Sequence, residues 1–311
     1  VTLFSRNYQS VAQLCKLSAI IHGLRNPALI IAVDHEGGRV QRFRDGFTAL
    51  PAMGRLGRIW DHDPRRARRM ARQVGWVMAT ELRGCGVDIS FAPVLDIDYG
   101  ASGVIGDRAF HRDPEAISKL ARSLQLGMKR GGLPTVGKHF PGHGYIRADS
   151  HHDIAIDERE YTQIATVDLV PFQRMIAHGL NAIMAAHVIY PKIDSVPSGF
   201  SHTWLHDILR TKLGFDGVVI SDDLGMHAAS VAGDAVQRAT ACLQAGCDMA
   251  LLCGGDMDAV LDHLRWEAPA ESRARIMRLK RGLRTSDTRR IREAPHFLAA
   301  VQAVAEVAGS A

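Results

Sequence analysis

Residues 217–226 read GVVISDDLGM, and this stretch indicates the fold class. A run of apolar, mostly β-branched residues over 218–220 is followed by a serine and then by two aspartates. An uninterrupted apolar strand is typical of a parallel sheet that is covered by helices on both faces. A helical pattern follows over 231–245, so the stretch predicts a strand–helix unit.

The same alternation extends in both directions along the chain. Strands are expected over residues 1–4, 28–33, 87–91, 134–138, 182–186, 217–221 and 247–252. Helices are expected over residues 10–23, 63–83, 113–131, 158–178, 202–213, 231–245 and 256–266, with further helices at about 270–283 and 292–308. This pattern predicts an α/β fold, a TIM-type (β/α)8 barrel.

No linker or change in composition divides the chain, so residues 1–311 are expected to form one domain, on which the helices at about 270–308 pack. Seven strands are visible where a closed barrel has eight. The barrel is therefore expected to lack its first strand and helix before Val1. A doubly wound sheet is the alternative, but residues 31–40 (IAVDHEGGRV) do not match its glycine-rich phosphate loop.

The composition of the chain indicates which binding partners and which cellular compartment to expect. The formal charge of +5 comes largely from arginine-rich stretches at 65–72 and 272–293, which read as solvated helix faces rather than a nucleic-acid-binding motif. Five cysteines without a CxxC favour free thiols in a reducing compartment, so a cytoplasmic location is expected. No apolar run reaches 18 residues and no signal peptide is visible, so no membrane contact is expected. We expect a monomer.

Polar residues directly follow the predicted strands. In a parallel barrel, catalytic groups lie at the C-terminal ends of the strands. A single aspartate there is as well explained as a helix N-cap, but the whole set favours a functional site. Strand position cannot decide which of the last two aspartates faces the site. The residues are Asp34, Asp96, Asp98, Lys138, His139, His187, Asp222 and Asp223.

Residues 138–153 (KHFPGHGYIRADSHHD) form a second dense group of ionisable side chains. Its glycines and proline predict a loop. Asp149 and His151 would share a face of an extended segment, and a carboxylate beside an imidazole suits a general acid/base. From these residues alone, however, a surface turn is the better interpretation. Asp34, Arg39 and Arg42 in one loop, and Arg108 in another, add charged groups that could contact a ligand.

The types and positions of these residues are equally consistent with two classes of enzyme. A metal-dependent hydrolase could take ligands from His139, His143, His151, His187, Asp222 and Asp223, although the usual ligand spacings are absent. A metal-free glycoside hydrolase could use Asp222 as nucleophile and His151 as proton donor. A barrel that only binds its ligand is a third possibility, but it would not need the Asp149–His151 pair.

Five segments together resemble the signatures of glycoside hydrolase family 3, and in particular its single-domain bacterial β-N-acetylglucosaminidases of the NagZ type. The resemblance covers residues from about 2 to 265. The segments are IAVDHEGGRVQRF (31–43), GDRAFHRDP (106–114), GKHFPGHG (137–144) with ADSH (148–151), AIMAAHVIYP (182–191) and GFDGVVISDDLGM (214–226).

The resemblance implies a retaining exo-β-N-acetylglucosaminidase that acts on peptidoglycan fragments in cell-wall recycling, without metal or cofactor. It implies Asp222 as nucleophile, His151 as acid/base and Asp149 as the residue that orients His151. The implied sugar-binding residues are Asp34, Arg42, Arg108, Lys138 and His139.

Two residues depart from the family pattern. His35 stands where the family usually has glutamine and is expected to alter the edge of the sugar pocket. His152 could compete with His151. A preference between muropeptides and chito-oligosaccharides, and between water and phosphate as acceptor, stays open.

Overall fold

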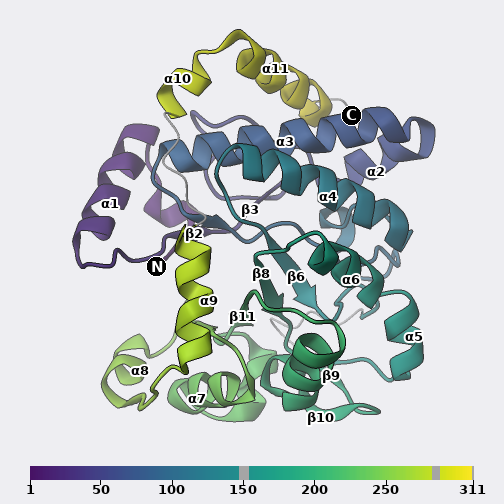
Figure 1. Ribbon diagram of the computed structural model, residues 1–311, viewed down its shortest axis with the longest axis vertical. Helices are drawn as coiled ribbons and strands as arrows, with labels where there is room; N and C mark the ends of the chain where they lie inside the picture. Colours follow the sequence, from purple (N-terminus) through teal and green to yellow (C-terminus); the bar gives the residue numbers. More distant parts are fainter. Residues whose placement is uncertain (147–153, 282–287, 310–311) are drawn as a thin grey trace.

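Seven short parallel strands form the centre of the fold (Figure 1). The computed structural model describes residues 1–146, 154–281 and 288–309. Each strand predicted from the sequence overlaps one of them, although β6 and β11 each extend two residues past the predicted end. The strands are β1 (Thr2–Leu3), β2 (Ala32–Val33), β5 (Ile89–Ser90), β6 (Val136–Phe140), β8 (Ala182–Ala185), β11 (Val218–Asp223) and β12 (Met249–Leu251).

The strands pair in an order that follows the sequence. One sheet runs β1–β2–β5 and a second runs β6–β8–β11–β12, with parallel pairing throughout both. A parallel bridge from Val94 to Lys138 joins the two sheets into one arc. All seven strands therefore present their C-terminal ends on the same side, as the sequence predicts.

The arc does not close into a barrel within the described residues. There, β1 pairs only with β2, and β12 pairs only with β11. An apolar cavity of about 450 Å³ lies between these two edge strands, lined by residues that include Val1, Ile30, Met249 and Leu261. A closed eight-stranded barrel is thus not found among the described residues, because no described strand joins β12 to β1. The sequence predicts seven strands, with the first strand of the barrel missing, and these seven are the ones observed.

Helices cover the outside of the arc (Figure 1). Asp63 and Asp113 cap α3 and α4 by accepting hydrogen bonds from main-chain amides, and a proline follows each at the first helical position. No helix in the described ranges is both long and apolar enough to cross a membrane. The helices are α1 (Val11–Gly23), α2 (Met53–His62), α3 (Pro64–Gly84), α4 (Pro114–Arg130), α5 (Tyr161–Thr166), α6 (Leu169–Ala177), a π-helix (Thr203–Lys212), α7 (Ala235–Ala245), α8 (Met257–His263), α9 (Ala270–Arg281), α10 (Thr288–Arg292) and α11 (Pro295–Gly309).

The C-terminal helices pack on this framework. Leu279 of α9 joins the apolar cluster on the inside of the arc. Helix α11 lies along α3, where the rings of Phe297 and Trp76 meet edge to face at 5.1 Å (Figure 1). Arg55 of α2 donates hydrogen bonds to the last carbonyls of α11.

Some local predictions were wrong. The single helix expected over 158–178 is two helices, α5 and α6, because Pro171 fits only the first turn of a helix and so requires a new start near Asp168. The sequence pattern also missed α2, whose two glycines disfavour a helix. It missed the hairpin β3 (His35–Gly37) and β4 (Val40–Gln41), and the small sheet of β7 (Ala155–Ile156), β9 (Val188–Tyr190) and β10 (Asp194–Pro197).

Helices α3 and α4 approach closely because glycines face each other's backbone. A β-carbon at Gly127 would lie 2.0 Å from the carbonyl oxygen of Arg72, and one at Gly75 would lie 2.2 Å from the carbonyl oxygen of Leu124. Neither contact can be relieved by moving a side chain, so the α3–α4 packing depends on both glycines.

We predict that Gly127→Ala lowers the free energy of unfolding by about 1–3 kcal/mol, because the helices must separate to admit the methyl group. Gly23→Ala, at the end of α1 with nothing within 4 Å of the new methyl, serves as the control and should not destabilise. Urea denaturation measures both variants. Equal stability of the two variants would contradict the close approach.

Candidate active site

A cavity of about 410 Å³ opens at the C-terminal ends of the strands. This volume is within the usual range for small-molecule sites. Nine of the residues singled out from the sequence line it together: Asp34, Arg39, Arg42, Arg108, Lys138, His139, His143, Asp222 and Asp223. They come from the residue after β2, the turn between β3 and β4, the loop after β4, a 3-10 turn (Gly106–Arg108), β6 and the loop after it, and β11. The polar strand ends therefore do converge on one site.

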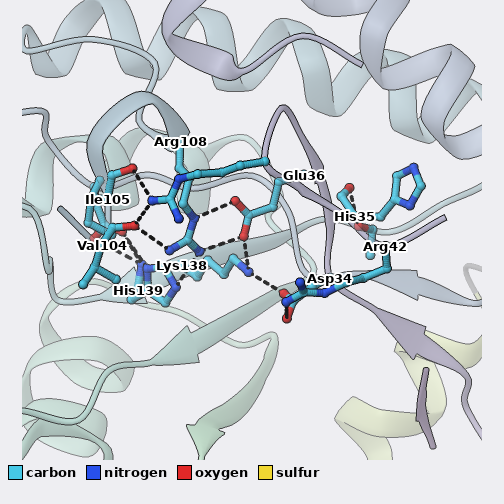
Figure 2. A network of polar contacts seen from close by, with 12 residues as sticks. Asp34, His35, Glu36, Arg42, Val104, Ile105, Arg108, Lys138 and His139 are labelled. Atoms are coloured by element: carbon cyan, nitrogen blue, oxygen red, sulfur yellow. Dashed lines mark hydrogen bonds and ion pairs between the residues drawn. The ribbon is translucent and has the colours of Figure 1, made fainter. Parts of the chain in front are cut away.

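Lys138 lies at the centre of a buried ion-pair cluster on the cavity wall (Figure 2). Its side chain is only 2% exposed, and Nζ lies 2.8 Å from Asp34 Oδ1 and 2.6 Å from Glu36 Oε1. Burial alone would lower the pKa of Lys138, but the two carboxylates raise it above its usual value. Lys138 is therefore a permanent cation that bridges β2, β3 and β6.

Arg108 completes the cluster from the opposite side of Glu36. Its Nε and Nη2 donate to the two carboxylate oxygens of Glu36 at 2.9 and 2.8 Å, a bidentate pair. Burial would raise the pKa of Glu36, yet Lys138 and Arg108 hold it well below its usual value. Two cations thus flank one buried anion, and Asp34, about a quarter exposed, faces the cavity beside them.

His139 is fixed by a second buried carboxylate, Asp96. Its Nδ1 donates to Asp96 at 2.6 Å, and the main-chain amides of His139 and His143 also donate to Asp96. The other ring nitrogen, Nε2, lies 3.3 Å from Nη2 of Arg108, which can only donate. This arrangement sets the tautomer of His139, with its hydrogen on Nδ1 and a lone pair on Nε2. The Lys138–His139 peptide bond is cis.

The two aspartates at the end of β11 differ in their surroundings. Asp223 Oδ1 accepts hydrogen bonds from the amides of Gly225 and Cys253, both at 2.9 Å, so it organises the loops around it. Asp222 Oδ1 accepts from the amide of Asp223 at 2.8 Å. Burial raises the pKa of Asp222, but His139, His187, this amide and Lys138 together lower it. Asp222 is therefore a carboxylate at neutral pH.

Arginines and Phe4 form the mouth of the cavity. Arg42 Nη2 lies 3.5 Å from Asp34, and its guanidinium also lies over the Phe4 ring at 5.9 Å. Arg39 donates to main-chain carbonyls at Gly103 and Val104 and so ties the 103–105 loop to the rim. Cations, an aromatic face and carboxylates around a small cavity suit a polar, hydroxyl-rich ligand.

The remaining residues singled out from the sequence lie elsewhere. Asp149, His151 and His152 lie outside the described residues. His35 does not line the cavity: its ring packs against Phe43 and Phe47 and points away from the cluster (Figure 2), and burial lowers its pKa to about 3. The expectation that His35 alters the edge of the pocket is therefore wrong. Asp98 Oδ1 accepts a hydrogen bond from the main-chain amide of Gly100 at 2.9 Å and so stabilises a turn.

The ligand set considered for a metal hydrolase does not converge in the part of the chain that the structure describes. The one described group of three with converging ligand atoms is His202, His206 and Asp207, which lies on the surface. Within the cavity, His139 contacts Asp96 and Arg108, and Asp222 and Asp223 accept hydrogen bonds from main-chain amides.

Sequence reasoning missed Glu36 and underrated Asp96. Asp34 and Glu36 stand two residues apart, and in an extended segment their side chains share a face, so this spacing was the available signal. Asp96 stood out only as a polar strand end. Its partnership with His139 joins residues 43 apart in the chain, a distance at which no local pattern is visible.

Comparisons with known proteins agree on one family. Residues 1–279 match the family described as "Glycosyl hydrolase family 3 N terminal domain". A beta-hexosaminidase of Methylobacillus flagellatus is 55% identical over 309 residues, which are 99% of this chain and 88% of that protein. A beta-hexosaminidase of Nitrosospira multiformis is 54% identical, with the same coverage of both chains.

Solved structures give the same result. NagZ from Neisseria gonorrhoeae in complex with N-trifluoroacetyl-D-glucosamine aligns with a TM-score of 0.93 and 46% identity, over 99% of this chain and 90% of that one. NagZ from the same organism in complex with zinc ion aligns at 0.91 and 44%, with the same coverage. A family 3 β-N-acetylglucosaminidase from Paenibacillus aligns at 0.86 and 30%, over 99% of this chain and 62% of that one.

Replacing Glu36 tests the buried cluster. We predict that Glu36→Gln lowers the free energy of unfolding by about 3 kcal/mol at pH 7, because Lys138 and Arg108 lose a shared anion. The pKa of Glu36 is depressed by folding, so its contribution is full above its ordinary value of 4.5 and is lost as the pH falls. The difference between variant and wild type should shrink by about 1.4 kcal/mol per pH unit below that value.

Denaturant titrations at several pH values measure this difference. Glu115→Gln is the control, since Glu115 pairs with Arg174 on the surface and should change the stability by less than about 1 kcal/mol. A pH-independent difference for Glu36→Gln would contradict the assigned ionisation.

Proposed function

Because this chain belongs to glycosyl hydrolase family 3 and is a glycoside hydrolase, we propose that it removes terminal β-linked N-acetylglucosamine by a retaining mechanism. One observation carries the proposal: an ionised carboxylate, Asp222, shares a small cavity with the Asp34–Lys138–Glu36–Arg108 cluster. Relatives more than half identical to this chain are named beta-hexosaminidases, which supports the choice of sugar.

Asp222 is the nucleophile of the proposed reaction. A retaining glycosidase needs one carboxylate that is ionised and can attack the anomeric carbon. The lowered pKa of Asp222 keeps it in this form, and its place at the end of β11 holds it on a rigid element. The attack forms a glycosyl ester and expels the leaving alcohol, and water then hydrolyses the ester.

The ion-pair cluster holds the sugar. Asp34 and the carboxylate-bound Lys138 offer an acceptor and a donor side by side, a pairing that suits neighbouring hydroxyls. Arg42, Arg108 and His139 line the remaining wall. Because the cations and anions neutralise one another before substrate binds, they need not reorganise around the sugar.

His151 is the proposed acid/base, and Asp149 is proposed to orient it. Both lie outside the described residues, and their roles follow from the family resemblance. His143, eight residues before His151 in the sequence, lines the cavity. A histidine can protonate the leaving oxygen in its charged form and activate water in its neutral form, so one residue can serve both steps.

The finer assignments belong to the same proposal. The substrates are fragments of peptidoglycan, the location is the cytoplasm, and the reaction uses no metal or cofactor. The protein acts as a monomer without nucleic-acid or membrane partners. Its parallel arc is a barrel of the TIM type with one position open between β12 and β1, and residues 1–311 act as a single domain.

An aryl β-N-acetylglucosaminide assay tests the activity. We expect release of the aryl alcohol that is unchanged by a metal chelator, with N-acetylglucosamine of retained anomeric configuration as the product. Asp222→Ala should lower kcat by about 10⁴-fold or more. Asp223→Asn keeps an acceptor for the loop amides and, as the control, should stay within about tenfold of wild type.

Three results would contradict this proposal. Loss of turnover with chelator would favour a metal hydrolase. A glycosyl phosphate formed in phosphate buffer would assign a phosphorylase. If no glycoside were turned over, the protein would be assigned as one that binds its ligand without catalysis.

Leaving-group dependence tests His151. We predict that His151→Ala slows hydrolysis of substrates with poor leaving groups far more than that of an activated nitrophenyl glycoside, because only poor leaving groups need protonation. Comparison of kcat/KM across a series of aryl glycosides measures the difference, with His152→Ala as the matched control. An equal loss on all substrates, or the selective loss in His152→Ala instead, would remove His151 from this role.

A further inference from the structure

The imidazole of His187 is completely buried beside Asp222 and has no part in the mechanism proposed above. It lies in the short connection between β8 and β9, and its Nε2 is 3.2 Å from the main-chain carbonyl oxygen of Asp222. We propose that His187 is a positioning residue that holds the backbone of the nucleophile through this hydrogen bond. The inference rests on the proposed role of Asp222.

The partner atom fixes the tautomer of His187. A carbonyl oxygen only accepts, so Nε2 must carry the hydrogen. Burial lowers the pKa of His187 and outweighs the opposing effect of Asp222 and Asp223, so the ring is neutral and Nδ1 has no hydrogen. Nδ1 has no hydrogen-bond partner among the described residues. Among the described residues, the hydrogen bond of the His187 ring is therefore the one to the carbonyl oxygen of Asp222.

The bond stands where the strand pairing ends. The parallel register of β8 and β11 runs from Ala182 and Val218 to Ala185 and Ser221. After Ala185, β8 ends and the chain continues into β9. The backbone of Asp222 therefore has no pairing partner in β8. The side chain of His187 donates to the carbonyl at this next position. It therefore extends the support of β11 by one residue, to the residue proposed to react.

The ring has little freedom to leave this position. Its face stacks on Phe200 at 5.0 Å with an interplanar angle of 21°. On another side, a β-carbon at Gly199 would lie 3.1 Å from Nδ1, so the glycine backbone itself packs against the ring. The amide of Gly199 and the hydroxyl of Ser198 both donate to the carbonyl of Ala186, which ties this turn to the end of β8.

Two hydrogen bonds thus act on Asp222 from different directions. His187 holds the main-chain carbonyl, and the amide of Asp223 holds Oδ1 of the carboxylate. A nucleophile must be placed to within about 0.5 Å. The sugar is bound by other side chains, so removing the His187 donor should slow the attack without weakening sugar binding.

Two substitutions at one position test this role. Leucine at position 187 keeps a buried side chain of similar size but has no donor, whereas glutamine keeps an N–H at a similar reach. We expect His187→Leu to lower kcat by about 10- to 100-fold, with KM changed less than about threefold. His187→Gln should recover most of the loss. His22→Leu is the control, because it removes a histidine hydrogen bond to Asp88 far from the cavity.

Active-site labelling separates positioning from folding. A ring-fluorinated N-acetylglucosaminyl fluoride should trap the glycosyl-enzyme, and intact-protein mass spectrometry counts the labelled molecules. Positioning predicts complete labelling of His187→Leu at a reduced rate. A purely structural role predicts incomplete labelling at the wild-type rate, and this outcome would overturn the proposal, as would unchanged kinetics in His187→Leu or failure of glutamine to rescue. Wild type that neither turns over aryl glycoside nor becomes labelled would instead overturn the proposed function.

Discussion

The buried ammonium group of Lys138 is the constraint on which the site depends. A buried cation is tolerated only when carboxylates surround it, and here Asp34 and Glu36 do so at 2.8 and 2.6 Å. Glu36 in turn needs Arg108, and Arg108 contacts His139. Meeting this one requirement brings β2, β3, β6 and the 106–108 turn to fixed positions. The same groups then stand ready for a sugar beside Asp222.

The order of the fold and the place of the site were predictable from the sequence. Every predicted strand is present, and Asp34, Lys138 and Asp222 do meet at one end of the arc, because parallel strands share that edge. Both signals are local: a run of apolar residues and the polar residue that ends it. The strand count also predicted one missing barrel strand, and in the described residues β1 and β12 do not pair with each other.

Contacts between distant residues were beyond the sequence patterns. Asp222 and Asp223 are adjacent and chemically identical, and only their surroundings distinguish them: Asp223 accepts two loop amides, while Asp222 is supported by His187 and faces the ion-pair cluster. His35 shows the reverse case, where a residue in a functional motif proves to be part of the aromatic core. The roles of Asp149 and His151 came from the family resemblance alone, because a local Asp-x-His pattern also fits a surface turn.

A crystal structure of the wild-type enzyme trapped with a ring-fluorinated N-acetylglucosaminyl fluoride tests the central claim most directly. The account predicts a covalent bond from the anomeric carbon to the carboxylate of Asp222, with the sugar hydroxyls bound by Asp34, Lys138 and Arg108. The ion pairs of Lys138 with Asp34 and Glu36 should be retained. A bond to Asp34 or Asp223, or a sugar bound outside this cavity, would contradict the account.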